Sequence, residues 1–302
     1  MLKFKAWLNA ARLRTLPLSV SGVITGTALA NLYQEKDITI FILALLTTIA
    51  FQVTSNFAND YGDGVKGTDN EDRIGPKRAM QSGLLSRTAL KNGIILSVIV
   101  SMALVIALVF KAFGSENLSM ILVFLGLGAL SIWAAIKYTV GESAYGYRGL
   151  GDVFVFLFFG ILAVMGTMFL YTKTIVWVAI MPAIAIGALS TGVLNLNNLR
   201  DLESDKKAGK NTMIVKMGLS RGKLYHYILV CVSMLCIIGF LAIYAESTTE
   251  FAPLLAFVPI LVHLRRVHTI ENPKSFDPEL KKLALSTFLL AVLLFISCNK
   301  FL

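Results

Sequence analysis

Acidic and amide side chains gather in two short stretches of this 302-residue sequence. In each stretch steps of three or four residues link them, so a continuous helix would carry them on one face. Such a face presents a row of oxygen atoms that is suited to binding a cation. The first row consists of Asn56, Asn59, Asp60 and Asp63, and the second consists of Asn197, Asp201 and Asp205.

The ligand chemistry of both rows is that of a hard metal ion. Like charges at helical spacing oppose each other by a few tenths of a kcal/mol, and a bound cation removes that conflict. Carboxylate and amide oxygens suit Mg²⁺ or Ca²⁺, and neither row contains the Cys or His that zinc prefers. Mg²⁺ usually takes one or two carboxylates and completes its shell with water and substrate phosphate. The rows therefore predict a Mg²⁺ site.

Basic residues follow each acidic row. Acidic residues that bind a metal ion, next to basic residues that bind phosphate, are typical of a binding site for a phosphorylated substrate. The diphosphate-binding candidates are Lys66, Arg73, Lys77 and Arg78 after the first row, and Lys206 and Lys210 after the second. The simpler alternative is that all of these are solvated loop charges, which is the usual state of one Asp at the end of a membrane span.

The elements that carry the rows are expected to be membrane helices. The sequence is 56% hydrophobic and only 15% charged, whereas a soluble domain carries about 25% charged residues. This excludes a soluble globular protein, a disordered chain and a disulfide scaffold. Apolar stretches long enough to span a bilayer lie approximately at Leu16–Leu32, Ile38–Phe57, Gly93–Phe113, Leu118–Ile136, Val153–Tyr171, Ile175–Asn198, Tyr225–Tyr244, Ala252–Leu264 and Leu283–Cys298.

The basic residues are distributed unevenly between the two sides of a nine-span arrangement. All but four of the 28 Lys and Arg residues fall on the side of the N-terminus. The positive-inside rule places that side in the cytoplasm and the C-terminus outside. The net charge of +10 then reflects this asymmetry and contact with anionic lipid, and we expect no nucleic-acid partner. The chain is expected to form one membrane domain over residues 1–302, with polar cytoplasmic loops at about 58–91, 137–152 and 199–224.

Three stretches of the sequence resemble the UbiA superfamily of intramembrane prenyltransferases, and most closely its 1,4-dihydroxy-2-naphthoate polyprenyltransferases. The stretches are residues 59–83, 147–160 and 197–212, and the likeness covers most of residues 11–220. The last three spans are generic. In the second row Gly209 stands where many relatives of other subgroups have a third acid, and Asp69 is offset from simple helical spacing after the first row.

The resemblance implies an all-α bundle of about nine transmembrane helices in a bacterial plasma membrane. It implies transfer of a polyprenyl group from polyprenyl diphosphate to 1,4-dihydroxy-2-naphthoate, with loss of CO₂ and diphosphate, to give demethylmenaquinone for menaquinone biosynthesis. Mg²⁺ is the implied cofactor, and no obligate protein partner is evident. The residues carried over as catalytic are Asp60, Asp63, Asp201 and Asp205.

Aromatic and basic residues near the cytoplasmic ends are candidates for binding the acceptor and the prenyl group. An aromatic face stabilises an allylic cation by about 0.5–2 kcal/mol, and a cation can pair with the acceptor carboxylate. The candidates are Tyr61, Tyr138 and Tyr145 for the first role, and Lys137 and Arg148 for the second. Ordinary helix packing and topology-setting charge are the respective alternatives.

Two other functions compete with this interpretation. The first is a prenyltransferase for another aromatic acceptor, such as 4-hydroxybenzoate. The second is a divalent-cation transporter, because intramembrane acids are its usual signature. The acids here lie at span ends beside basic loops rather than at the bilayer midplane, which disfavours the transporter.

Overall fold

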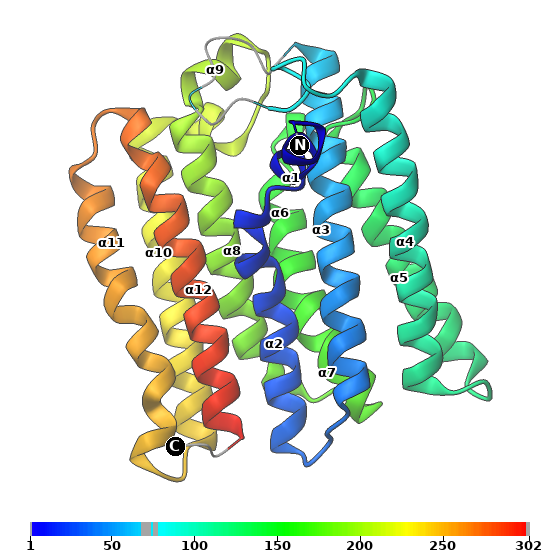
Figure 1. The fold of residues 1–302 in the computed structure, drawn as a ribbon. Helices are drawn as coiled ribbons and strands as arrows, with labels where there is room; N and C mark the ends of the chain where they lie inside the picture. Colours follow the sequence, from blue (N-terminus) through cyan, green and yellow to red (C-terminus); the bar gives the residue numbers. More distant parts are fainter. Residues whose placement is uncertain (1, 68–73, 75–77, 300–302) are drawn as a thin grey trace.

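The computed structural model describes residues 2–67, 74 and 78–299, and this part of the chain is helical, with no strand. It contains nine helical segments that are long and apolar enough to cross a membrane. The segments run roughly alongside one another between two ends of the bundle, with the N-terminus and α9 at one end and the C-terminus at the other (Figure 1). The expected all-α bundle of about nine spans is confirmed.

The spans correspond to the expected apolar stretches, with several extended at one end. The first span combines α1 (Leu2–Ala11) and α2 (Leu16–Leu32), the fifth combines α6 (Gly151–Val155), the π-helix η3 (Phe156–Gly166) and α7 (Thr167–Thr172), and the eighth combines the 3₁₀-helix η5 (Thr248–Ala256) and α11 (Phe257–Thr269). The others are α3 (Ile38–Lys66), α4 (Arg87–Phe113), α5 (Leu118–Lys137), α8 (Ile180–Arg200), α10 (Met213–Tyr244) and α12 (Asp277–Cys298). The short α9 (Leu202–Lys207) follows α8.

Three of the long helices, α3, α4 and α10, begin at a side chain that caps them. Asp37 accepts hydrogen bonds from the backbone N–H groups of Thr39 and Ile40 at the start of α3. Ser86 caps α4 in the same way, and Thr212 caps α10. Each cap satisfies a backbone donor that a helix end leaves without a partner. Polar residues between the apolar stretches therefore help to fix where these three spans start.

Arg12 interrupts the first span. Its backbone lies in the left-handed region, with φ 49° and ψ 56°, and this breaks the helix between α1 and α2. A non-glycine residue in that region is uncommon and costs free energy unless its surroundings hold it there. The break turns the Arg12 guanidinium toward α3, where it forms an ion pair with Asp60.

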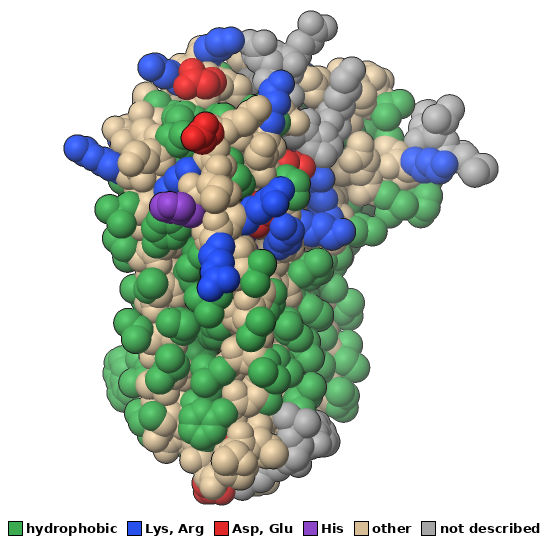
Figure 2. Space-filling view, turned by 90° about the vertical axis from the view of Figure 1, so that its left-hand side faces the viewer, with side chains coloured by type: hydrophobic (Ala, Val, Ile, Leu, Met, Phe, Trp, Pro, Cys, Tyr) green, Lys and Arg blue, Asp and Glu red, His purple; other side chains and the backbone are tan. Residues whose placement is uncertain are grey.

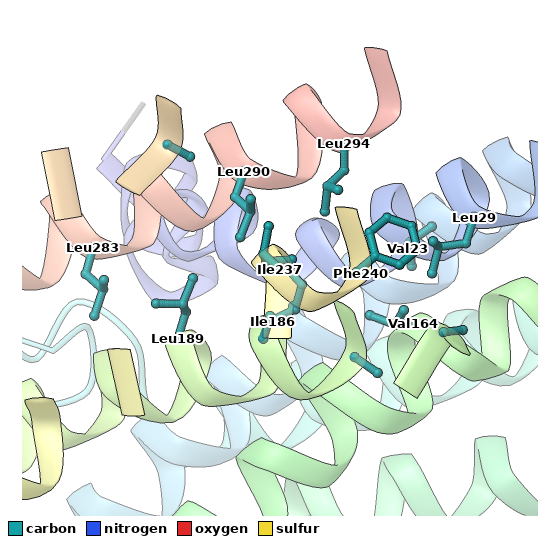
Figure 3. Packing of buried hydrophobic residues seen from close by; sticks show 14 of the residues in the cluster. Val23, Leu29, Val164, Ile186, Leu189, Ile237, Phe240, Leu283, Leu290 and Leu294 are labelled. Atoms are coloured by element: carbon teal, nitrogen blue, oxygen red, sulfur yellow. The ribbon is translucent and has the colours of Figure 1, made fainter. Parts of the chain in front are cut away.

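The core lies around α2 and α8. In the most apolar windows of these two spans 61% of the residues are buried inside the protein, against 22% in α3, α4 and α5. Figure 3 shows leucine, isoleucine, valine and phenylalanine side chains from α2, η3, α8, α10 and α12 packed into one cluster. These three less buried helices expose several large apolar side chains, among them Leu46, Leu96 and Leu122, as expected for helices that contact lipid.

Small residues allow the central helices to approach closely. A Cβ atom on Gly160 of η3 would lie 2.6 Å from the carbonyl oxygen of Ala183, on α8. A Cβ atom on Gly22 of α2 would lie 2.5 Å from the Cβ of Ala163. Small residues at such contacts are the usual means by which membrane helices pack backbone to backbone. The π-helical segment is thus held on two sides by close contacts.

Charged side chains are concentrated toward one end of the bundle. Figure 2 shows Lys and Arg in the upper half of the face formed by the last helices, and hydrophobic side chains over the lower half. The upper end is the one that holds the N-terminus and α9. This distribution agrees with the asymmetry that the sequence shows.

A buried polar chain joins the last three spans. The Nε2 atoms of His226 (α10) and His263 (α11) lie 2.9 Å apart. His263 Nδ1 lies 2.7 Å from a carboxylate oxygen of Glu279 (α12), and Lys282 donates to the other oxygen at 2.6 Å. His226, His263 and Glu279 are each at most 1% exposed. Buried polar groups are stabilising only when they are hydrogen-bonded. This series of hydrogen bonds therefore fixes the relative positions of the three helices.

We expect Glu279→Ala to lower the thermal unfolding midpoint of the purified protein in detergent. The substitution leaves the buried His263 N–H without its acceptor, which costs about 1–3 kcal/mol. Glu116→Ala, at an exposed position after α4, is the matched control and should leave the midpoint nearly unchanged. Equal midpoints for wild type and Glu279→Ala would contradict a stabilising role for the chain.

Candidate active site

A cavity of about 440 Å³ lies inside the bundle. Most of its wall is apolar and comes from α2, α3, α4, α5 and the π-helical segment. Polar side chains gather where the lining reaches the last turns of α3 and α8. Those that the sequence predicts as site residues and that line the cavity are Asn56, Asn59, Asp63, Arg78, Asn197 and Lys210, with Tyr138 and Tyr145.

The first row lies on one continuous helix, as expected, because α3 continues past Phe57 to Lys66. Asn56 is buried and donates to the carbonyl oxygen of Ala11 at 2.8 Å. Asp60 is 1% exposed and is not among the described residues that line the cavity. It accepts a hydrogen bond from Arg12 at 2.5 Å and another from Arg78 at 3.0 Å.

Asp63 lies one turn further along α3 and lines the cavity. One of its carboxylate oxygens accepts a hydrogen bond from the hydroxyl of Tyr147 at 2.8 Å. The ammonium group of Lys66 lies 3.9 Å from the centre of the same tyrosine ring, and that of Lys210 lies 5.6 Å from it. A carboxylate and two ammonium groups thus meet around one aromatic side chain.

The second row is divided, because α8 ends at Arg200 and the chain turns at Asp201 before α9 begins. Arg200 is 4% exposed and donates two hydrogen bonds to Asp201, at 2.8 and 2.7 Å. It also donates to Asn197 at 2.7 Å and to Asp277 of α12 at 2.6 Å. A buried guanidinium requires hydrogen-bond acceptors. Here the second row and the start of α12 provide them.

Asp205 and Lys210 form a buried pair beyond that turn. Asp205 is 3% exposed, and Lys210 Nζ lies 3.6 Å from its Oδ1 atom. Burial raises the pKa of Asp205 to about 6, with the nearby carboxylates of Asp201 and Asp63 adding to the effect against the opposing charge of Lys210. Burial alone would lower the pKa of Lys210, but the fields of Asp205 and Asp63 outweigh it and raise that pKa. The two rows therefore act on each other at the same end of the bundle (Figure 1).

The oxygen atoms at this end fit a hard divalent cation. Asp205 Oδ2 is buried and has no hydrogen-bond partner among the described residues, and the same holds for Asn198 Oδ1. Within the described ranges no three His, Cys, Asp or Glu side chains form a metal site by themselves. Mg²⁺ does not require that number, because it takes one or two carboxylates together with water and phosphate oxygens. The metal role of each acidic residue stays a prediction.

The remaining candidates for diphosphate binding lie in different surroundings. Lys66 is exposed at the end of α3, and Lys206 is exposed on α9. Arg73 and Lys77 lie outside the described residues, as does Asp69.

The aromatic candidates divide into two groups. Tyr138 and Tyr145 line the cavity, and their rings continue into a stack: Tyr145 lies 3.9 Å from Phe154 between ring centroids, with an interplanar angle of 20°. Phe154 in turn lies 6.0 Å from Phe158. Tyr61 accepts a hydrogen bond from Arg87 at 3.3 Å instead. Tyr61, Lys137 and Arg148 are not among the described residues that line the cavity.

Three residues of this region were not identified as site residues from the sequence. In the sequence, Arg12 counted only among the basic residues on the side of the N-terminus. In the structure it donates a hydrogen bond to Asp60. Arg200 does not share the helical spacing of the second row. Its position next to Asp201 in the sequence was the only signal of the contact between them. Tyr147 lies in a stretch that carries the family resemblance, but nothing in its spacing indicated a contact with Asp63.

Comparison with known proteins identifies the family. A model of the UbiA prenyltransferase family matches residues 19–297 of this chain. The chain belongs to this family. Similar proteins named 1,4-dihydroxy-2-naphthoate octaprenyltransferase occur in Haemophilus influenzae, 45% identical over 293 residues, and in Escherichia coli, 43% identical over 292 residues. Each match covers 96% of this chain and 94% of the relative. The resemblance inferred from the three sequence stretches is confirmed.

Solved structures share the fold of this UbiA family member. A UbiA homolog from Archaeoglobus fulgidus, bound to GPP and Mg²⁺, matches with a TM-score of 0.68 over 97% of this chain and 99% of its own, at 16% identity. The apo structure of a UbiA homolog from Aeropyrum pernix K1 matches with a TM-score of 0.71 over 93% of this chain and 98% of its own, at 14% identity. At such identities the likeness concerns the fold alone.

We expect Lys210→Met to lower the thermal midpoint of this UbiA family protein in the absence of metal. Removal of one partner from a buried ion pair typically costs about 3–5 kcal/mol, because it leaves an uncompensated charge. Added Mg²⁺ should then raise the midpoint of the variant by more than it raises that of wild type. Lys206→Met, four residues earlier and exposed, is the control. A midpoint for Lys210→Met that matches wild type, with or without Mg²⁺, would be evidence against the buried pair.

Proposed function

We propose that this protein transfers a polyprenyl group from polyprenyl diphosphate to 1,4-dihydroxy-2-naphthoate, with release of CO₂ and diphosphate, to give the quinol form of demethylmenaquinone. The observation that carries the proposal is the naphthoate octaprenyltransferase name of relatives 45% and 43% identical over nearly the whole chain. A cavity with a charged end and an apolar wall supports it, because the substrate has a charged head and an apolar tail.

The charged end suits a diphosphate. Lys210 and Arg78 both line the cavity there and offer donors to phosphate oxygens. The carboxylates beside them would repel the same diphosphate, by about 4 kcal/mol for a pair of unit charges at 4 Å and an effective dielectric of 20. Mg²⁺, when bound near these carboxylates, would supply the positive charge that offsets this repulsion and stabilises the leaving diphosphate. We propose that Asp60, Asp63, Asp201 and Asp205 provide this acidic environment, with Asn56, Asn59 and Asn197 beside them.

The apolar wall suits a prenyl chain. Along α3 the lining extends from Asp63 back to Ala44, which at the helical rise corresponds to about 28 Å. This is close to the hydrocarbon thickness of a bilayer, about 30 Å. A long apolar tail can therefore lie alongside the membrane interior while its diphosphate stays at the charged end.

The aromatic stack supports an aromatic acceptor. Tyr138, Tyr145 and Phe154 contact one another in series and all line the cavity. Their faces can pack against a bicyclic ring in offset or edge-to-face geometry. The same faces stabilise the positive charge that develops on the allylic carbon as the diphosphate departs. We propose that this stack positions the ring of the acceptor next to the reacting carbon.

We also propose that the end with the two acidic rows faces the cytoplasm of a bacterial plasma membrane. The asymmetry of basic residues supports this orientation. Alkaline phosphatase becomes active only when it folds outside the cytoplasm. A fusion of this reporter to the C-terminus should therefore be active, and a fusion after Lys207 should be inactive. The reverse pattern would contradict the orientation.

The identity of the acceptor is tested by supplying two aromatic acids in separate assays. Purified protein is supplied with Mg²⁺, octaprenyl diphosphate and either 1,4-dihydroxy-2-naphthoate or 4-hydroxybenzoate. We expect a prenylated product and CO₂ release in equal amounts with the naphthoate, and neither with the benzoate. The expected difference rests on the acceptor carboxylate, which leaves only in the proposed naphthoate reaction.

Two variants control this assay. Asp60→Ala and Asp201→Ala should express and insert as wild type does but form no measurable product, because each removes an acid from one of the rows. Full turnover in either variant, or prenylation of 4-hydroxybenzoate without CO₂ release, would refute the corresponding part of the proposal. Cation flux in liposomes that contain no prenyl diphosphate would favour the transporter instead.

A further inference from the structure

Tyr147 occupies the junction of the loop after α5 with both acidic rows. It belongs to a short 3₁₀-helix, Tyr145–Arg148, and it is not among the described residues that line the cavity. Its hydroxyl contacts Asp63 of the first row. Its backbone carbonyl accepts a hydrogen bond from the N–H of Asn211 at 3.0 Å, in the segment that follows the second row. One residue therefore ties three separate parts of the chain together.

The hydroxyl of Tyr147 fixes the orientation of Asp63. It donates to Oδ1 at 2.8 Å, which is a short, charge-assisted hydrogen bond. A carboxylate held through one oxygen presents the other oxygen in a defined direction, and Asp63 faces the cavity. Partners of this kind behind a metal ligand typically change metal affinity about 10–100-fold when they are removed.

The ring of Tyr147 holds two cationic groups. The ammonium groups of Lys66 and Lys210 lie 3.9 and 5.6 Å from the ring centroid. Both distances fall within the range at which an aromatic face attracts a cation. Lys210 is 8% exposed, whereas Lys66 is exposed. Two like charges brought to one ring repel each other, and a diphosphate is the kind of ligand that relieves this repulsion.

A second contact keeps the loop in register with the first row. Thr139 donates to the carbonyl oxygen of Ala58 at 3.1 Å and contacts Asn59 at 3.2 Å. A Cβ atom on Gly62 would collide with this threonine. The loop that carries Tyr147 is thus seated against α3 independently of the tyrosine, so a change in the side chain need not displace the backbone.

We propose that Tyr147 is a positioning residue with two separable functions: its hydroxyl orients Asp63 toward the metal, and its ring places Lys66 and Lys210 for the diphosphate. The inference rests on the proposed function, because it assigns the site a metal and a prenyl diphosphate. It assigns Tyr147 no contact with the substrate. Tyr147 acts through Asp63 and the two lysines.

The test separates the hydroxyl from the ring. Tyr147→Phe removes the hydrogen bond to Asp63 and keeps the ring, whereas Tyr147→Leu removes both. Binding of geranyl thiodiphosphate, a non-reacting substrate analogue, is measured by calorimetry on the full-length protein at a series of Mg²⁺ concentrations. We expect Tyr147→Phe to raise the Mg²⁺ concentration for half-maximal binding about tenfold or more. At saturating Mg²⁺ its affinity for the analogue should stay within about twofold of wild type.

Tyr147→Leu should show the same Mg²⁺ shift and a second defect. Its affinity for the analogue at saturating Mg²⁺ should fall about 2–30-fold, the effect of a lost cation–aromatic contact. In turnover, the KM for the prenyl diphosphate should rise with it while the KM for the aromatic acceptor stays unchanged. A structural role alone would not produce this division between two substrates and the metal.

Tyr171→Phe is the matched control. Tyr171 is buried, whereas Tyr147 is half-buried, and the Tyr171 hydroxyl hydrogen-bonds to Thr27 in another part of the bundle. This variant should therefore match wild type in Mg²⁺ dependence. Unchanged Mg²⁺ dependence in Tyr147→Phe would overturn the hydroxyl function, and equal analogue affinities in the Phe and Leu variants would overturn the ring function. If wild type binds the analogue with Mg²⁺ but does not prenylate the naphthoate, the acceptor assignment fails and the Tyr147 result still stands.

Discussion

Charge compensation in a place with little water organises the polar end of this protein. Asp60, Asp201 and Asp205 are each at most 6% exposed, and each contacts a cationic side chain within 3.6 Å. A carboxylate moved out of water loses several kcal/mol of hydration, which only a close counter-charge with further hydrogen bonds can offset. The positions of the acids therefore dictate where arginine and lysine side chains must lie.

These ion pairs connect segments that are far apart in the sequence. Asp60 holds Arg12 at the break in the first span, so the break is tied to α3. Arg200 reaches Asp277 at the start of α12, which ties the second acidic row to the last span. The His226–His263–Glu279 chain continues the connection to α10 and α11. The three generic C-terminal spans are thus coupled to the polar end through buried polar contacts.

The membrane imposes the opposite requirement along the rest of the bundle. With no water in the hydrocarbon region, backbone groups must be satisfied within helices, which explains why a fold of helices surrounds the cavity. The segment Phe156–Gly166 nevertheless departs from α-helical geometry and forms a π-helix against the cavity. π-helical turns are rare and often lie at functional sites. Here the segment contributes Phe158 to the aromatic stack that lines the cavity.

Sequence reasoning determined much of this protein because the signals involved are local. Hydropathy over a window of one span gives nine helices, and Asn and Asp at helical spacing give the row on α3, since both depend only on the order of neighbouring residues. The family followed from three short stretches of the same kind.

Only the tertiary structure decided which acidic residues line the cavity and which form ion pairs with basic side chains. Asp60 and Asp63 lie on one helix three residues apart, yet Arg12 and Arg78 bind the first, while Tyr147 binds the second beside the cavity. Those partners come from three other segments, and their approach depends on the backbone break at Arg12, the loop that carries Arg78 and the short 3₁₀-helix that carries Tyr147. Helical spacing fixes the direction in which a side chain leaves its own backbone. It contains no information on which distant charge arrives there, because that depends on how the whole chain removes its ionised groups from contact with lipid.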